Sequence, residues 1–349
     1  MSTFTFFENG DTVESIDRVF SSAWSDNTND LATLGFFSSS TQYDTSTPTS
    51  SGAFFMEIYQ KDPTTDGAEV QFSIAYGHKK GSGSLNFTNE VGGKGLSATR
   101  STYSQYRTLV YGGDETQNFS FDGYEPDDIY IINVNRARYK TALRLGNIDL
   151  KLSGSGGIIR LTDDSKTTSG SANAIRAGVG REFNLVSGSN GIRKGSSNTF
   201  VTNSGSYGYV YPDAGFIILN ADTLDALGSA GGIELGTQGG DHQDRQNPVK
   251  FQDALKLGNT FILDGQEDIS SKFYFIRAKN TEFNYTTNDS FTEDDGTLKF
   301  DSMIDNPETY ITTVGLYNDN QDLLAVAKMS QPLPKDFTKE ALIKVKLDY

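Results

Sequence analysis

Histidine, the side chain that most acid–base and metal sites use, occurs only twice in this sequence, at His78 and His242. His242 lies in the most chemically varied stretch, where Asp241, His242 and Asp244 could bind a divalent cation or exchange protons. With only two histidines, the sequence offers almost no residues for a Ser-His-Asp triad or a multi-histidine metal site. We favour the alternative that residues 239–247 form a solvated polar loop.

Carboxylates are abundant, and adjacent pairs recur at Asp127-Asp128, Asp163-Asp164 and Asp294-Asp295. Residues 292–297 offer oxygen ligands of the kind that calcium takes, but no stretch has the alternating pattern of a calcium-binding helix–loop–helix. With 45 acidic residues, two carboxylates at the spacing used for glycoside hydrolysis remain an open alternative. No short motif singles out such a pair.

The glycine-rich and serine-rich stretches lack the spacing of known catalytic loops. Residues 76–84 combine glycines with His78, Lys79 and Lys80, yet they lack the phosphate-binding G-x-x-x-x-G-K-[ST] spacing and precede no helix-forming run. We interpret them as a basic loop that contacts an acidic neighbour. No G-x-S-x-G motif occurs, and the lack of cysteine excludes disulfides and thiolate metal sites. We therefore expect no catalytic residues, no metal and no cofactor.

A few aromatic and basic residues are better candidates for contacts with other proteins. Trp24 could stack on a sugar, but we favour a buried anchor that holds an N-terminal arm to the body or to a neighbour. Arg136 and Arg138 belong to the most basic run, where Tyr139 could add stacking on single-stranded nucleic acid. A net charge of −15 disfavours a phosphate-binding surface. We therefore interpret this run as an edge that forms salt bridges with another subunit.

The elements that must position these residues are mostly strands. Only 36% of the residues are hydrophobic, but 23 Phe and 17 Tyr supply large apolar surfaces for cores. The 36 glycines and the many Ser, Thr and Asn residues favour turns and short strands. The composition predicts a mainly β (β-rich α+β) fold, with antiparallel sheets or sandwiches, a few short helices and long Gly/Ser/Asn-rich loops.

Periodicity and turn chemistry place the individual elements. Alternating or continuous apolar runs predict strands at residues 2–7, 54–59, 70–76, 119–121, 128–135, 148–152, 158–161, 182–186, 207–211, 216–220, 260–263 and 273–278. Residues 130–134 are apolar enough for a central strand. Residues 99–111 have helical spacing, residues 221–227 predict one helical turn, and residues 13–24 fit either a short helix or an extended arm.

We divide the chain into four segments. They are an N-terminal arm and loop (1–52), the first part of a β-rich body (53–145), a β-rich insertion or second domain with long loops (146–264), and the second part of the body (265–349). The last segment ends in a β-hairpin and a strand. Aromatic-rich strands in the first and last thirds predict one sheet system assembled from both ends of the chain.

The C-terminal stretch has the clearest pattern. Residues 310–315 alternate, Asn318-Asp319-Asn320 supplies a turn, and residues 323–327 return as the partner strand. Pro332 and Pro334 should stop that ladder, because proline donates no backbone hydrogen bond. Residues 341–347 predict a last strand with two faces. Leu342, Lys344 and Lys346 lie on one face, and Ile343, Val345 and Leu347 lie on the other.

This stretch also carries a resemblance. It is similar to a hairpin in tail-fibre-attachment and baseplate proteins of tailed phages. The similarity lies in the run Val314-Gly315-Leu316-Tyr317, the polar turn that follows it, residues 323–327 and a proline–lysine step. The turn departs from the fibre-attachment pattern because it lacks the usual glycine. The wider chain resembles virion structural proteins of large contractile-tailed phages (myovirus type), notably those that infect cyanobacteria.

The resemblance implies a structural component of a virion, in the tail, baseplate or tail-fibre-attachment region, assembled in the host cytoplasm. It implies binding to other phage structural proteins in symmetric multi-copy assemblies, with no enzymatic role. Alternatives are a head–neck or decoration protein of the same particle, a receptor- or glycan-binding tail module using residues 207–211, and a glycan-cleaving enzyme. The expected subunit contacts are Trp24, His78, Lys79, Arg136, Arg138, Leu316, Tyr317 and Tyr349.

We expect neither nucleic acid nor a membrane among the partners. Residues 1–10 have no basic and apolar regions of the kind that a signal peptide needs. The longest apolar runs, residues 129–134 and 216–219, are far shorter than a membrane-spanning helix requires.

Overall fold

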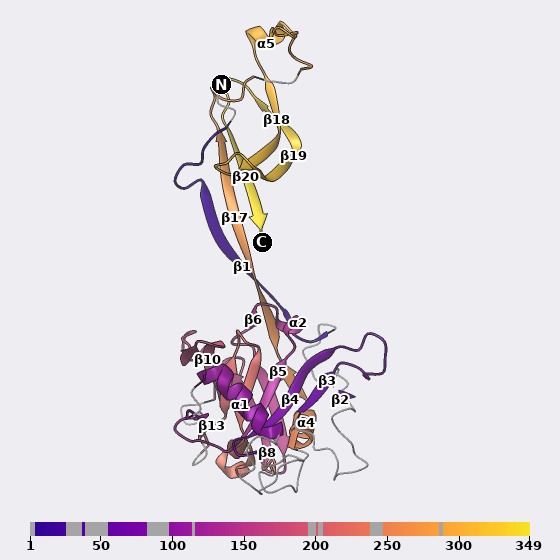
Figure 1. The fold of residues 1–349 in the computed structure, drawn as a ribbon, viewed down its shortest axis with the longest axis vertical. Helices are drawn as coiled ribbons and strands as arrows, with labels where there is room; N and C mark the ends of the chain where they lie inside the picture. Colours follow the sequence, from indigo (N-terminus) through magenta and orange to yellow (C-terminus); the bar gives the residue numbers. More distant parts are fainter. Residues whose placement is uncertain are drawn as a thin grey trace. The chain divides into compact units, whose positions relative to one another are not determined.

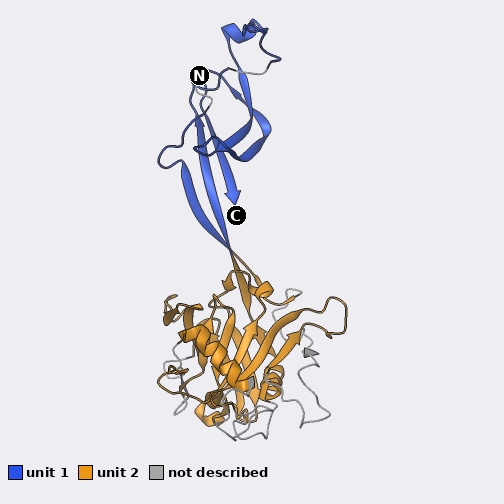
Figure 2. Cartoon of the chain, in the orientation of Figure 1, with its two compact units in different colours: residues 1–18, 268–349 blue, residues 19–267 orange. Residues whose placement is uncertain are grey.

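A computed structural model describes residues 4–25, 37–38, 55–81, 98–113, 116–194, 200–201, 205–237, 247–285 and 289–349. The chain divides into two compact units (Figure 1 and Figure 2). Unit 1 consists of residues 1–18 and 268–349, and unit 2 consists of residues 19–267. Strands β1 (Thr12–Ser22) and β17 (Asp264–Ala278) contribute residues to both units.

Unit 2 contains most of the secondary structure. Its further strands are β2 (Phe37–Ser38), β3 (Phe55–Tyr59), β4 (Val70–His78), β5 (Asp128–Val134), β6 (Ala142–Leu143), β7 (Asp149–Gly154), β8 (Gly157–Asp163), β9 (Ala174–Arg176), β10 (Gly180–Ser189), β11 (Ile192–Arg193), β12 (Phe200–Val201), β13 (Gly205–Ser206), β14 (Gly208–Tyr211), β15 (Phe216–Asn220) and β16 (Thr260–Ile262). Its helices are α1 (Ala98–Tyr111), α2 (Arg136–Tyr139), α3 (Ala221–Asp225), α4 (Asn247–Gly258) and the 3-10 helix η4 (Gly228–Ala230).

A large antiparallel sheet organises unit 2. Among the described residues it has twelve strands, in the order β16-β7-β8-β10-β14-β15-β5-β4-β3-β2, with β9 and β11 paired to β10. Strand β5 is central as the sequence predicts, because Ile131 lies opposite Ala75 of β4 and Ile218 of β15. The mainly β fold is therefore confirmed.

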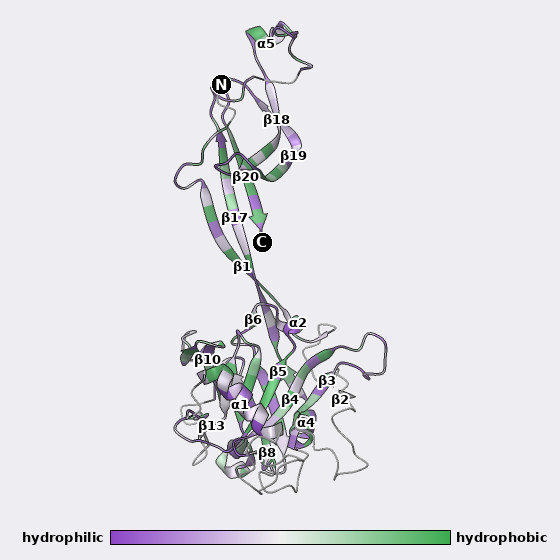
Figure 3. Ribbon diagram, viewed as in Figure 1, coloured by the Kyte–Doolittle hydropathy of each residue, from purple (hydrophilic) through white to green (hydrophobic). Residues whose placement is uncertain are grey.

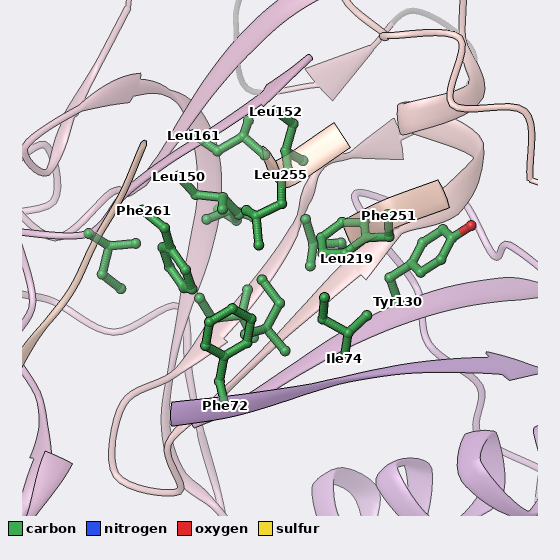
Figure 4. Close-up of a cluster of buried hydrophobic side chains, with 14 of the residues drawn as sticks. Phe72, Ile74, Tyr130, Leu150, Leu152, Leu161, Leu219, Phe251, Leu255 and Phe261 are labelled. Atoms are coloured by element: carbon green, nitrogen blue, oxygen red, sulfur yellow. The ribbon is translucent and has the colours of Figure 1, made fainter. Parts of the chain in front are cut away.

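The central strands bury both faces. In β5, Ile129 and Ile131 join one apolar core, whereas Tyr130 and Ile132 join the other, as a period of two requires. Helix α1 packs on β4 at the first core, and a Cβ at Gly77 would lie only 3.0 Å from the backbone nitrogen of Tyr103. The second core contains α4 and the strands β7 and β16 (Figure 4).

The sequence analysis missed α4, although its signals are present. Phe251 and Leu255 are four residues apart and both are buried in the second core. Pro248 lies in the first turn, where its missing N–H costs nothing, and Gly258 is the last helical residue. The stretch is short and follows a run of polar residues in the sequence, which hid this pattern.

Unit 1 contains two small antiparallel sheets. Strand β17 lies between β1 and β20 (Ala341–Asp348), and β18 (Thr309–Tyr317) pairs with β19 (Leu323–Lys335). A short helix, α5 (Ser302–Asp305), precedes β18. The C-terminal hairpin is confirmed: the backbone nitrogen of Asn318 donates to the carbonyl oxygen of Asp322 at 3.0 Å. The predicted two sides of the last strand are confirmed as well, because Val345 is buried and Lys344 and Lys346 are exposed.

For residues 13–24 the sequence left a short helix and an extended arm open, and residues 12–22 form the extended alternative, strand β1, because β17 offers them a strand partner. Three predictions of other single elements were wrong. Strand β19 continues through Pro332 and Pro334, since proline is tolerated where its nitrogen does not face a partner strand. Residues 119–121 make only an isolated bridge between Phe121 and Tyr124. Residues 4–7 form no strand.

The predicted assembly of a sheet from both ends of the chain describes unit 1, where β1 pairs with β17 beside β20. The sequence-based boundary near residue 146 does not coincide with a division between the units. Strand β7 follows this point directly and belongs to the same sheet as β5, because β8, β10, β14 and β15 connect them.

Candidate functional site

Ionisable side chains gather in unit 2 where β4 ends and β5 begins. The hydroxyl of Tyr76 donates a hydrogen bond to Asp128, and Nε2 of His78 lies 3.8 Å from the same carboxylate. The backbone nitrogens of Lys80 and Gly81 both donate to Nδ1 of His78 at 3.0 Å. These bonds occupy Nδ1 as an acceptor and leave the proton of the neutral ring on Nε2.

The surroundings shift the pKa values of this cluster in opposite directions. Burial, together with the negative charges of Asp222, Asp127 and Asp225, raises the pKa of Asp128 to about 7. Burial lowers the pKa of His78 to about 4. At neutral pH His78 is therefore uncharged, and Asp128 can hold or release a proton.

Helix α3 contributes the acidic residues beside this cluster. The hydroxyl of Tyr124 donates to Asp222 at 2.6 Å, and this hydrogen bond raises the pKa of Tyr124 to about 12. The backbone nitrogen of Thr237 donates to Asp225 at 2.8 Å. Asp222 and Asp225 are three residues apart and share a helix face, a spacing that could have been read from the sequence. No three acidic or histidine side chains of the described ranges are arranged to hold a metal ion.

The other acidic pairs of the sequence have local structural roles. Asp163 is fully buried, and the backbone N–H of Gly146 donates one bifurcated hydrogen bond to its two carboxylate oxygens, at 3.0 and 2.9 Å. Asp164 binds the side chain of Asn184 at 2.8 Å. Asp295 accepts hydrogen bonds from Thr297 in an exposed turn. The stretch with Asp241, His242 and Asp244 lies outside the described residues.

Three of the predicted contact residues lie near one another in unit 2. Trp24 is buried: its Nε1 donates to the carbonyl oxygen of Phe261 at 2.7 Å. Arg138 pairs with Glu69 at 3.0 Å and borders, with Trp24, a polar pocket of about 260 Å³. Arg136 lies over the ring of Tyr139, 4.8 Å from its centroid.

The remaining predicted contact residues are more exposed, apart from His78 and Leu316. Lys79 lies 3.7 Å from Glu125, and the end of its loop, residues 82–84, falls outside the described ranges. Leu316 is buried in β18, and the adjacent Tyr317 is 45% exposed. Tyr349 is also exposed, although its backbone pairs with Ser270. The structure thus distributes these residues over both units and does not gather them into one site.

Most of the exposed large hydrophobic side chains of the described residues belong to unit 1. Among the described residues of this unit, the buried hydrophobic residues are only Ala278, Leu316, Ala341 and Val345. Its exposed large hydrophobic residues are Phe4, Phe6, Phe7, Val13, Ile16, Phe283, Tyr285, Phe300, Ile304, Tyr310, Tyr317, Leu323, Leu324, Val326, Phe337, Leu342 and Tyr349. Figure 3 shows apolar stretches recurring along the strands of this unit. Large exposed apolar patches are typical of surfaces that bind another protein.

Comparisons of the chain with protein-family models, curated proteins and solved structures gave no match. In the described ranges, every helix is too short or too polar to cross a membrane. Two features stand out in the described residues: the buried ionisable cluster of unit 2 and the exposed apolar strands of unit 1.

Proposed function

We propose that this chain is a structural component of a tailed-phage virion, in the tail, baseplate or tail-fibre-attachment region, and that it acts by subunit–subunit assembly. The observation that carries the proposal is the exposed apolar surface of unit 1. Transfer of one such side chain from water into a protein interface is favourable by about 1.5–3 kcal/mol. Seventeen of them in one small unit favour a protein that meets its partners through this unit.

The resemblance of the C-terminal hairpin supports the same proposal. The residues that carry it, Val314 to Tyr317 and residues 323–327, lie on β18 and β19 of unit 1. Leu324 and Val326 are exposed on this hairpin and are available to a neighbouring subunit. The partners would be other structural proteins of the particle, in symmetric multi-copy arrangements.

A glycan-binding role draws less support from the structure. The aromatic residues that suggested it, Tyr207, Tyr209 and Tyr211, are all buried, and their hydroxyls bond within unit 2. Stacking on a sugar requires an exposed ring face. These tyrosines therefore do not offer the platform that the sequence suggested.

Mass spectrometry of purified and fractionated phage particles tests the proposal. We expect this chain in the tail or baseplate fraction, at a fixed ratio to a known tail subunit. A constant ratio in the head or neck fraction would assign it to a different layer and contradict the tail location. Detection in the infected-cell lysate alone would contradict a virion role.

A further inference from the structure

A groove in unit 1 lies between two strand edges. It encloses about 350 Å³ and is lined by residues 327–331 of β19, residues 343–346 of β20, and Val314. Sites for small ligands start at about 300 Å³. The walls include the apolar residues Ala327, Met329 and Val345, together with three lysines, Lys328, Lys344 and Lys346. The groove therefore suits an apolar side chain that has an acidic neighbour.

The backbone on both sides of this groove is available to an added strand. Among the described strands, β17 alone pairs with β20, so the other edge of β20 has no strand partner. In β19, Leu333 pairs with Ile311 of β18, and Lys328 pairs with Thr313. Residues 329–332 of β19 therefore lie opposite the single residue Thr312 and form a bulge. Unpaired strand edges of this kind bind an extended segment through main-chain hydrogen bonds.

The chain itself contains a segment of the matching kind. Residues 2–7 have the alternation of a strand, yet the described part, residues 4–7, belongs to no sheet. The rings of Phe4 and Phe7 contact Tyr317 and Tyr274, at 5.2 and 5.4 Å between centroids. Between them, Phe6 is 84% exposed, more than any other large hydrophobic residue of the described ranges.

The charge next to this segment complements the groove. Glu8 follows Phe6 by two residues and is exposed. The groove carries Lys328 and Lys344, together with Lys346, which already pairs with Asp348 at 3.0 Å. Lysines on a strand edge disfavour the pairing of two such edges with each other. They favour a guest segment that carries a carboxylate.

We propose that residues 4–8 of one copy exchange their ring contacts with Tyr317 and Tyr274 for the groove between β19 and β20 of a second copy, with Phe6 as the inserted side chain. Every copy carries both the segment and the groove, so reciprocal docking can close a symmetric oligomer. This inference rests on the proposed function, because it names one partner and one surface for the assembly.

Cross-linking tests the contact directly, because the natural chain has no cysteine. One chain would carry Phe6→Cys and a second, size-tagged chain would carry Met329→Cys. Under mild oxidation we expect a disulfide between the two chains. The matched control replaces Met329→Cys by Ile175→Cys, an exposed residue of unit 2, and should give no such product above background.

The same pair placed in one chain supplies a further control. With Phe6→Cys and Met329→Cys together, a cross-linked product of two-chain mass supports docking between copies. A cross-linked monomer would show that the segment fills its own groove, and that result would overturn the proposal.

Sedimentation measures the energetic consequence. We expect the purified parent chain to associate at micromolar concentrations, and Phe6→Asp to weaken this association at least about 10-fold, since a buried aromatic anchor dominates such contacts. Ala327→Glu should weaken it similarly by repelling Glu8. Phe337→Asp, at an exposed residue outside the groove, should leave it unchanged.

A monomeric parent, or association that survives both Phe6→Asp and Ala327→Glu, would overturn the docking proposal. Neither outcome bears on whether the chain occurs in virions, so failure here is distinguishable from failure of the proposed function. Near-ultraviolet circular dichroism of each variant verifies that its tertiary structure is retained.

Discussion

Unit 2 buries its aromatic and branched residues on both faces of a large sheet, whereas unit 1 leaves most of its large apolar residues in solvent. The composition does not explain the difference, because both units contain alternating apolar strands. Unit 2 has covering layers: α1 lies on one face of its sheet and α4 on the other. The small sheets of unit 1 have no comparable helices among the described residues. The comparison indicates that unit 2 is stable by itself and that unit 1 depends on a partner.

The largest expected effect is the loss of stability caused by a substitution in the core of unit 2, compared with a substitution at an exposed site of unit 1. Phe251 stacks on Tyr130 at 5.0 Å in the core of unit 2 (Figure 4), so Phe251→Ala should lower the free energy of unfolding by about 3–5 kcal/mol. Urea denaturation followed by the fluorescence of Trp24 measures this, because the single tryptophan lies in the same core. Phe337→Ala, at an exposed site of unit 1, should change it by less than about 0.5 kcal/mol. Equal losses would contradict the comparison.

A second prediction compares ion pairs. Glu182 is fully buried and accepts hydrogen bonds from Arg176 at 2.9 Å and from the hydroxyl of Tyr211 at 2.9 Å. Arg176→Ala should cost about 3 kcal/mol of unfolding free energy, because it leaves a buried carboxylate without its cation. In unit 1, Arg18 and Asp268 form an exposed pair at 3.7 Å, so Arg18→Ala should cost less than about 1 kcal/mol. Thermal and urea unfolding of both variants would show whether the ranking holds.

The third prediction uses the ionisable cluster of unit 2. The pKa of Asp128 is raised in the folded chain, so the folded state holds a proton that the unfolded state releases, and this carboxylate lowers stability as pH rises from about 4 to about 7. Asp128→Asn should therefore gain stability relative to the parent over this range, by at most about 1.4 kcal/mol per pH unit.

His78 should show the opposite sign. Its folded pKa of about 4 lies below its unfolded value, so the unfolded state binds the extra proton and the parent gains stability as pH rises through this range to about 6.5. His78→Gln should lose stability relative to the parent as pH rises over the same window. Urea titrations at a series of pH values would measure both differences. Slopes of the same sign for the two variants would refute the assigned shifts.

The smallest effect on folding is expected on the hairpin of unit 1. Leu324 and Val326 are exposed on β19, so Leu324→Ser with Val326→Thr should change the free energy of unfolding by no more than about 0.5 kcal/mol. Incorporation into particles, measured by complementation of a phage that lacks the gene, should nevertheless fall. Normal incorporation would show that this face of the hairpin is not a contact surface.

Local patterns predicted much of the fold because they depend on neighbouring residues. The antiparallel pair β3–β4 with its turn at Asp62, the helix α1 ending at Gly112, and the C-terminal hairpin all follow from turn residues and apolar periodicity. Local patterns left the answer open where a distant segment decides. Residues 13–24 fitted a helix or an extended arm, and residues 12–22 form a strand because β17, some 250 residues later in the sequence, pairs with them.

The candidate sites show the same limit. The sequence singled out His78 and the pair Asp127-Asp128 separately, and the antiparallel register of β4 and β5 places His78 opposite Asp128. The residues Asp222 and Asp225 join them from almost 100 positions further along the chain, which no local pattern could reveal. The Asp241-His242 stretch, which looked the most reactive in the sequence, lies outside the described residues.

By itself, the sequence determined that the chain is mainly β, that it ends in a hairpin and an alternating strand, and that no disulfide or thiolate site can form. These properties follow from residue types and from the two-residue period of a strand. Only the tertiary structure decided which apolar strands are covered. Strand β5 is buried on both faces because α1 and α4 contribute to the cores on either side of it, whereas the apolar run at the start of β19 leaves Leu323, Leu324 and Val326 exposed. Burial depends on contacts between segments that are far apart in the chain, and the alternation within a strand carries no record of them.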